Sequence, residues 1–313
     1  GNKKMITLVA DVGGTQSRLG LVQNGVLNES SICNFLNNNF NSFYEVVSEY
    51  LRDKKEIKIF SCVIAIAGPI VEGKASFTNL DWNISDSEIK ILTKCGNVVL
   101  INDLTSLGYS LKKLAPKGIQ HIIGPEIFNR KNGQYLVVGL GTGFNVCPVV
   151  EDKSEKPVCL QVELGHISLP SSVKEVLFKK IGPCKFVTVE DLFSGKGLRD
   201  LYKVVSSGKI KSGEMISKEH LEKSDPYATQ TLELFSEMLG LMTRELILQY
   251  LPFGGIYFAG SVSRAIFNAK LTSKFEEAFK ENTHYFKELE KFQINLITDD
   301  AAGLLGCGVL SVA

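Results

Sequence analysis

The sequence predicts an α/β protein made of two halves that open in the same way. Each half starts with a strand, a short turn containing glycine and threonine, and a second strand: Met5–Asp11 and Leu19–Val22 around Gly13–Thr15, then Tyr135–Gly139 and Asn145–Val150 around Gly141–Gly143. Helical and strand-like segments alternate after each hairpin, which is typical of an α/β layer. We therefore expect a duplicated α/β domain with a ligand-binding cleft between the copies.

The first half continues with helices and strands that alternate. Two serines, each followed three residues later by glutamate, have the spacing of a capping box and precede apolar helical faces. The expected elements are a loop at Asn37–Asn39, helices from Ser42 (with Glu45) and from Ser85 (with Glu88) to about Lys94, and strands at Lys58–Ile66 and Val98–Ile101.

The second half contains the longest predicted helix. It starts at Asp225-Pro226, where proline fits the first turn, and ends before Pro252. Its apolar stripe, expected in the core, is Leu234, Met238, Leu241 and Leu246. The other expected elements are a helix from a capping box at Ser172 and Glu175, a strand at Ile256–Ala259, an amphipathic stretch at about Lys274–Phe292, a strand at Ile294–Thr298 and a terminal helix of small residues.

Composition excludes several classes of protein. The 313 residues carry a net charge of +1, with no dense basic block, so nucleic-acid binding is not expected. The most apolar stretch, Tyr135–Val150, is broken by three glycines and a threonine, so we expect no membrane span. The seven cysteines include no C-x-x-C pair and the four histidines are scattered, which favours reduced thiols in a cytoplasmic protein without structural zinc.

The two glycine-rich turns leave two interpretations open. Each joins two strands, whereas a Walker loop or a dinucleotide fingerprint would lead into a helix. Backbone N–H groups at such turns can hold a phosphate, and many such turns are only hairpins.

Several motifs taken together resemble the bacterial-type glucokinases over nearly the whole chain. They are Asp11–Thr15, Ile66–Pro69, Thr78-Asn79 with Trp82, Ile101–Asp103, Gly139–Gly143, Glu163–His166, Glu190 with Ser194-Gly195, Phe258–Gly260 and Gly303–Gly306. The resemblance implies two actin-like (ribonuclease H-like) domains around a central cleft. It also implies phosphorylation of the 6-hydroxyl of glucose, the first step of glycolysis, with ATP and Mg²⁺. We expect a small domain at residues 1–111, completed by 301–313, and a large one at 112–300; a homodimer is left open.

Asp103 is the expected catalytic base. It follows a predicted strand at its carboxyl end, where ligands of open α/β sheets bind, and Thr105 could cap the next helix. A carboxylate there can accept a hydroxyl proton, but it could equally be a charge that stabilises a helix N-terminus. The resemblance favours the base.

The resemblance also implies the ligands of the sugar. They are Asn79, Asn102, Glu163, His166 and Glu190. Fixed carboxylates and amides suit a ring of hydroxyls. From the residues alone, His166 could be a buried core histidine, Glu190 a first-turn helix acid, and Trp82 either packing or a sugar platform.

The expected nucleotide ligands come from both halves. They are Ala10, Asp11, Val12, Gly13, Gly14, Thr15, Gly141, Thr142, Gly143, Gly260 and Ser261, with Asp11 holding Mg²⁺ through water. Two positions depart from close relatives, which carry glycine where this chain has Asn145 and Ser261. We expect both on the nucleotide side. Ser261 should weaken the binding of ATP, and Asn145 should change it little. The chain also lacks the cysteine-rich zinc segment of the repressor/kinase branch.

Two other functions remain open from the sequence. One is a kinase for another hexose, such as mannose, fructose or an amino sugar. The other is a sugar-binding sensor with weak nucleotide turnover, which the two departures permit.

Overall fold

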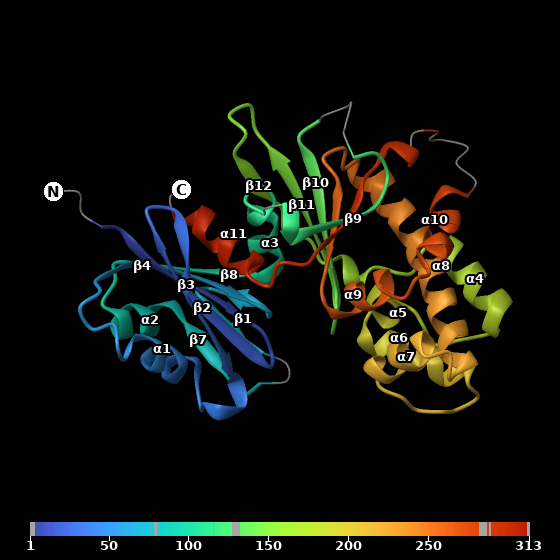
Figure 1. Cartoon of the computed structure of the whole chain (residues 1–313), viewed down its shortest axis with the longest axis horizontal. Coiled ribbons are helices and arrows are strands. Elements are labelled where there is room, and N and C mark those ends of the chain that lie inside the picture. Colours follow the sequence, from blue (N-terminus) through green and yellow to red (C-terminus); the bar gives the residue numbers. More distant parts are fainter. Residues whose placement is uncertain are drawn as a thin grey trace. The chain divides into compact units, whose positions relative to one another are not determined.

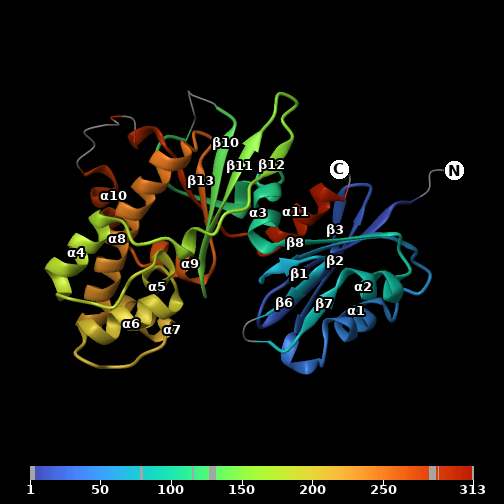
Figure 2. The same cartoon turned by 180° about the vertical axis from the view of Figure 1, so that it is seen from behind.

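The computed structural model describes residues 4–77, 80–114, 116–126, 132–281, 287 and 289–311 (Figure 1; seen from behind in Figure 2). The chain divides into two compact units. Unit 1 is Gly1–Gly118 with Asp299–Ala313, and unit 2 is Ile119–Thr298.

Unit 1 is built on a five-stranded sheet in the order β3-β2-β1-β4-β8. The first three strands are antiparallel neighbours, and β4 and β8 run parallel to β1. The strands are β1 (Ile6–Val12), β2 (Gln16–Gln23), β3 (Val26–Leu36), β4 (Ile59–Ile66) and β8 (Asn97–Asn102). Strand β3 was not predicted, because its sequence is polar and does not alternate.

Helices cover both faces of this sheet. Alternate residues of β1 point to opposite faces, so Leu8 packs in the cluster that contains α1 and α2, whereas Val9 packs against α11. Gly306 of α11 has no side chain where the Ser106 carbonyl of α3 approaches, which lets these helices pack closely. The helices are α1 (Phe43–Leu51), α2 (Asp86–Thr93), α3 (Asp103–Ser110) and α11 (Ala302–Leu310), with short 3₁₀ turns η1 (Asn37–Asn39) and η2 (Pro116–Gly118).

A small antiparallel sheet completes unit 1. Its strands are β5 (Ile70–Val71), β6 (Lys74–Ser76) and β7 (Asn83–Ser85). Trp82 is 4% exposed and lies beside the rings of Phe43 and Phe77, each with its centroid 6.4 Å away. Of the two roles open for Trp82, the structure supports packing.

Unit 2 repeats the plan with a six-stranded sheet, β12-β11-β10-β13-β14-β9. The hairpin β10–β11 is followed by the parallel strands β13 and β14, as β1–β2 is followed by β4 and β8, so the expected duplication is present. The strands are β9 (Ile119–Ile123), β10 (Gln134–Leu140), β11 (Phe144–Glu151), β12 (Pro157–Cys159), β13 (Ile256–Ala259) and β14 (Ile294–Ile297).

Most helices of unit 2 lie on one side of its sheet. Both views show α4 to α8 and α10 on the same side of the sheet. The long helix α8 has Asp225 as its N-cap and Pro226 in its first turn, and its expected apolar stripe is buried. The elements are α4 (Ser171–Ile181), α5 (Val189–Leu192), α6 (Gly195–Val205), α7 (Gly213–Leu221), α8 (Pro226–Tyr250), α9 (Ser261–Phe267), α10 (Thr272–Lys280), η3 (Leu164–His166) and η4 (Leu289–Lys291).

Helix α2 lies between Ser85 and Lys94 as predicted, but two of the expected capping boxes are not formed. Ser42 caps α1, but Ser85 makes no capping hydrogen bond to α2, because its hydroxyl pairs with Ser87. Ser172 is not a cap, because α4 already begins at Ser171 after Pro170. Within the predicted amphipathic stretch, α10 ends at Lys280, and residues 282–286 and 288 lie outside the described residues.

Candidate active site

In unit 1, two aspartates stand at the same edge of the sheet. Asp11 is near the carboxyl end of β1, and Asp103 directly follows β8 as the first residue of α3. Because β1, β4 and β8 are parallel, their carboxyl ends meet at one edge. Both side chains are partly buried.

The pKa values of both carboxyl groups are raised. Burial raises the pKa of Asp11 to about 6, although the nearby Arg18 guanidinium lowers it. Burial and the charge of Asp11 raise the pKa of Asp103 to about 7, although the Leu104 N–H lowers it. The pair therefore holds a carboxylate that exchanges its proton near neutral pH, which suits a general base.

The start of α3 orients Asp103. The Leu104 N–H donates to Asn102 Oδ1 and to Asp103 Oδ1, each at 3.0 Å. Asn102 is therefore the N-cap, and the expected cap Thr105 lies inside the helix. Asp103 does lie in a first helical turn, but the helix N-terminus alone would lower its pKa, so the raised pKa shows that burial and Asp11 dominate.

The Gly13–Thr15 turn is anchored by a hydrogen bond from a buried residue whose role was not predicted from the sequence. Asn37 is 1% exposed, donates from Nδ2 to the Gly13 carbonyl at 2.8 Å and accepts from the Ser17 hydroxyl at 2.7 Å. The expected loop at Asn37–Asn39 is thus a 3₁₀ turn that anchors the hairpin. In the sequence, only the run of three asparagines at positions 37–39 could have signalled this.

The exposed part of this turn is smaller than predicted. Gly14 and Thr15 are exposed, and a Cβ on Gly14 would meet no atom within 4 Å. Ala10 and Val12 are fully buried, so they support the strand instead of presenting atoms to a ligand. Gly303 of α11 has no side chain where the Asp11 carboxylate lies, and a Cβ there would collide with it.

In unit 2, the turn between β10 and β11 is tied to Glu190. Glu190 Oε1 accepts from the Phe144 N–H at 2.9 Å, and a Cβ on Gly143 would lie 2.5 Å from the same oxygen. A Cβ on Gly165 would collide with the Phe144 carbonyl. Glu190 is indeed an acid in the first turn of α5. Its hydrogen bond to Phe144 also connects α5 to the turn between β10 and β11.

Glu163 and His166 flank the short turn η3. Both are exposed, and neither side chain forms a hydrogen bond with another residue in the described ranges. The alternative that His166 is a buried core histidine is therefore wrong. These two groups are available for a ligand.

Two segments predicted around a nucleotide meet the start of α6 in unit 2. The Gly195 N–H donates to the Gly141 carbonyl at 2.8 Å, and a Cβ on Gly141 would lie 3.8 Å from the nitrogen and hydroxyl of Ser261. Gly260 has φ of 105° and no room for a Cβ against the Leu140 carbonyl, so glycine is required there. Thr142 is exposed beside them.

Ser261 occupies an ordinary helical position. It is the first residue of α9, and the left-handed conformation belongs to Gly260 before it. The conformational cost expected of Ser261 is therefore absent, and only direct contact with a ligand could make it matter.

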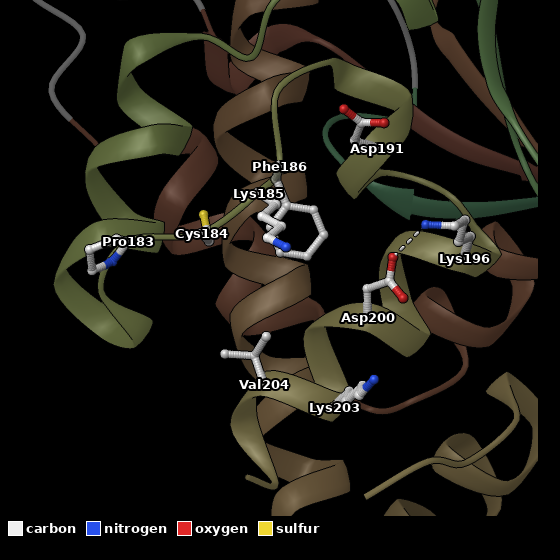
Figure 3. A pocket seen from close by; sticks show the side chains of 9 residues that line it. All are labelled: Pro183, Cys184, Lys185, Phe186, Asp191, Lys196, Asp200, Lys203 and Val204. Atoms are coloured by element: carbon white, nitrogen blue, oxygen red, sulfur yellow. Dashed lines mark hydrogen bonds and ion pairs between the residues drawn. The ribbon is translucent and has the colours of Figure 1, made fainter. Parts of the chain in front are cut away.

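Thr78 and Asn79, expected near the sugar, lie outside the described residues. A groove of about 430 Å³ on unit 2, between α6 and the segment before α5, holds none of the predicted site residues (Figure 3). It contains Asp191, the neighbour of Glu190, and the Lys196–Asp200 ion pair at 2.8 Å.

The described residues contain neither a cluster of metal-binding side chains nor a membrane-spanning helix. No group of three or more histidine, cysteine, aspartate and glutamate side chains there is arranged to hold a metal ion. In the same ranges, no helix combines the length and the apolarity needed to cross a membrane.

Comparisons with known proteins agree on one family. The family model described as glucokinase matches residues 8–312. A glucokinase of Photorhabdus laumondii is 30% identical over 314 residues, covering 96% of this chain and 95% of its own. The crystal structure of a glucokinase from an Antarctic psychrotroph has a TM-score of 0.82 and 27% identity, covering 97% of this chain and 98% of that chain.

A more distant structure shares the fold. The ROK family glucokinase of Streptomyces griseus, solved with glucose and AMPPNP, has a TM-score of 0.65 and 16% identity, covering 98% of this chain and 99% of that chain.

Proposed function

Because this chain belongs to the glucokinase family, we propose that it transfers the γ-phosphoryl group of ATP to the 6-hydroxyl of glucose. The actin-like fold and the aspartate pair of unit 1 fit this activity. The observation that carries the assignment of roles is the position of Asp103 directly after β8, at the sheet edge that also holds Asp11.

Asp103 is the proposed base. As the sugar oxygen bonds to the γ-phosphorus, Asp103 accepts the hydroxyl proton, and the bond from phosphorus to the bridging oxygen of ADP breaks. A pKa near neutral matches this task, because the group is ionised at working pH yet basic enough to take a proton. Phosphoryl transfer otherwise asks mainly for alignment and charge neutralisation.

The proposed sugar ligands are Asn79, Asn102, Glu163, His166 and Glu190. Support is strongest for Glu163 and His166, whose exposed side chains have no partner among the described residues. Glu190 keeps one carboxylate oxygen for a sugar hydroxyl while Phe144 fixes the other. A fixed carboxylate discriminates well between sugars, because it is left without a hydrogen-bond partner when the sugar lacks the matching hydroxyl.

The proposed nucleotide ligands are the exposed backbone at Gly13–Thr15 and the group Gly141–Gly143, Gly260 and Ser261. Turn amides and threonine hydroxyls suit phosphate oxygens. Ala10 and Val12 contribute by holding the turn.

Mg²⁺ fits the acid pair of unit 1. Asp11 would hold the ion through water, as suits a cation that keeps much of its hydration and takes one or two carboxylates. Burial raises the pKa of both aspartates and the charge of Asp11 raises that of Asp103 further, so a cation bound here would favour their ionised forms. When bound, the ion supplies neutralisation of the phosphate charge.

The cytoplasm is the proposed location. All seven cysteines are free thiols, and Cys62 and Cys95 stay unbonded although their sulfurs are 3.7 Å apart, as suits a reducing compartment. A homodimer is proposed from the family alone and is tested by light scattering during gel filtration.

A coupled ADP-release assay over a panel of hexoses tests the function. Glucose should give the highest kcat/KM, with ATP preferred over polyphosphate as donor. A better ketohexose or amino sugar would overturn the substrate, and sugar binding without sugar-dependent ADP release would favour the sensor.

A further inference from the structure

Asn145 replaces an expected glycine without using the conformational freedom of glycine. It lies in β11, where it pairs with Gly139 across the hairpin, and it is not among the residues with positive φ. Asn145 thus lies in the predicted strand and not in a left-handed turn. What Asn145 adds to the strand is its side chain.

That side chain holds the backbone on both sides of Glu163. Asn145 Nδ2 donates to the Val162 carbonyl at 2.8 Å, and Asn145 Oδ1 accepts from the Leu164 N–H at 3.0 Å. The same oxygen accepts from the Val146 N–H at 2.8 Å, which fixes the plane of the amide. One primary amide thus pairs with two backbone groups in the manner of a neighbouring strand.

Two consecutive residues of β11 therefore hold the segments of three proposed sugar ligands. The Phe144 N–H bonds to Glu190 directly at 2.9 Å, and the Asn145 amide immobilises the segment that carries Glu163 and starts η3, where His166 lies. Glu163 and His166 are themselves exposed, so the backbone beneath them must supply their order. With glycine at position 145, the Val162 carbonyl and the Leu164 N–H would lose this partner.

We propose that Asn145 is a positioning residue for the sugar: by bonding to Val162 and Leu164 it fixes Glu163 and the turn bearing His166, and so strengthens the binding of the hexose. The inference rests on the proposed function. It concerns sugar affinity alone, because the hydrogen bonds of the Asn145 side chain reach neither Asp103 nor a proposed nucleotide ligand.

The test compares Asn145→Ala with a matched control. Asn295→Ala removes an asparagine of the same unit that is 4% exposed and donates to the Ile256 carbonyl at 3.3 Å, far along the chain from every proposed ligand. The nearly isosteric Asn145→Asp keeps the acceptor oxygen but places an oxygen opposite the Val162 carbonyl. It provides a second variant if the alanine protein folds poorly.

Asn145→Ala and Asn145→Asp should each raise the glucose KM roughly five- to thirtyfold, as expected for two lost hydrogen bonds. The KM for ATP and kcat should stay within about twofold, and Asn295→Ala should leave the glucose KM unchanged. Hydrogen exchange of the Leu164 amide should become faster in Asn145→Ala but not in Asn295→Ala.

An unchanged glucose KM in a folded Asn145 variant of an active enzyme would overturn this inference alone. The same holds for a rise of equal size in Asn295→Ala. A wild-type protein without glucose-dependent ADP release would overturn the proposed function and, with it, this inference.

Discussion

The backbone N–H of Phe144 donates to Glu190 Oε1 at 2.9 Å, joining the glycine turn of unit 2 to helix α5. Gly143, the residue before Phe144, has no side chain where that carboxylate lies. The turn and the acid therefore depend on each other. A change in the turn should act on whatever Glu190 binds.

Gly143→Ala should weaken sugar binding. The new Cβ would lie 2.5 Å from Glu190 Oε1, so the carboxylate must move and its bond to Phe144 should break. We expect the glucose KM to rise about tenfold, the size of one lost charged hydrogen bond. Gly213→Ala is the control, because a Cβ there meets nothing within 4 Å. Equal glucose KM values in the two variants would show that Glu190 is not a sugar ligand.

Asp103→Asn should make the metal-free protein more stable at alkaline pH. The native state keeps the Asp103 proton up to about pH 7, whereas the unfolded chain releases it near 3.8, so native stability falls as pH rises between these values. The free energy of unfolding of the variant at pH 8 should exceed that of the wild type by on the order of 1 to 2 kcal/mol. This range already allows for the remaining solvent exposure of the carboxyl group.

Urea denaturation in EDTA at pH 8 and pH 4 measures this effect. The advantage of Asp103→Asn should largely disappear at pH 4, where the native wild type is protonated and roughly half of the unfolded chains are protonated. The exposed Glu29→Gln should show no gain. An Asp103→Asn protein less stable than wild type at pH 8 would mean that the helix N-terminus dominates after all.

Asp225→Asn should destabilise unit 2 through a buried network. Asp225 accepts from Tyr202 Oη at 2.6 Å, from Lys211 Nζ at 2.7 Å and from the Tyr227 N–H at 2.9 Å. Burial raises the pKa of Asp225, but these bonds outweigh it and hold the pKa well below its usual value. We expect the free energy of unfolding to fall by about 2 to 4 kcal/mol at pH 7.

The loss should depend on pH. The stabilisation by Asp225 is fully present above the ordinary pKa of 3.8 and disappears as pH falls towards the lower native value, so wild type and variant should converge in acid. Asp200→Asn, which removes an exposed lysine partner, should cost less than about 1 kcal/mol. Denaturant titration at pH 7 and pH 3 compares them; a pH-independent difference would contradict the account.

The sequence predicted those helices and strands whose own residues carry a clear local pattern. The buried strand β1, the hairpin β10–β11 and the helix α8 between Asp225 and Pro252 follow from apolar periodicity, glycine turns and proline position. Strand β3 escaped because its pairing with β2, and not its own composition, makes it a strand.

The supports of the site could not be read from local patterns. Asn37 reaches Gly13 across 24 positions, and Glu190 reaches Phe144 across 46. Such bonds arise only when the tertiary fold brings the segments together. Asn145 shows the same limit: its place in a strand follows from the sequence, but the hydrogen bond of its amide to Val162, 17 positions away, does not.

The most direct test of the central claim is glucose-dependent ADP release by the wild type and by Asp103→Asn, with glucose affinity measured by calorimetry on both. The wild type should turn over glucose with ATP. The variant should lose about 10² to 10⁴ in kcat, as expected for a positioned base, while its glucose affinity stays within about tenfold. An Asp103→Asn enzyme that keeps more than about a tenth of wild-type turnover would contradict the account, because Asp103 could not then be the base.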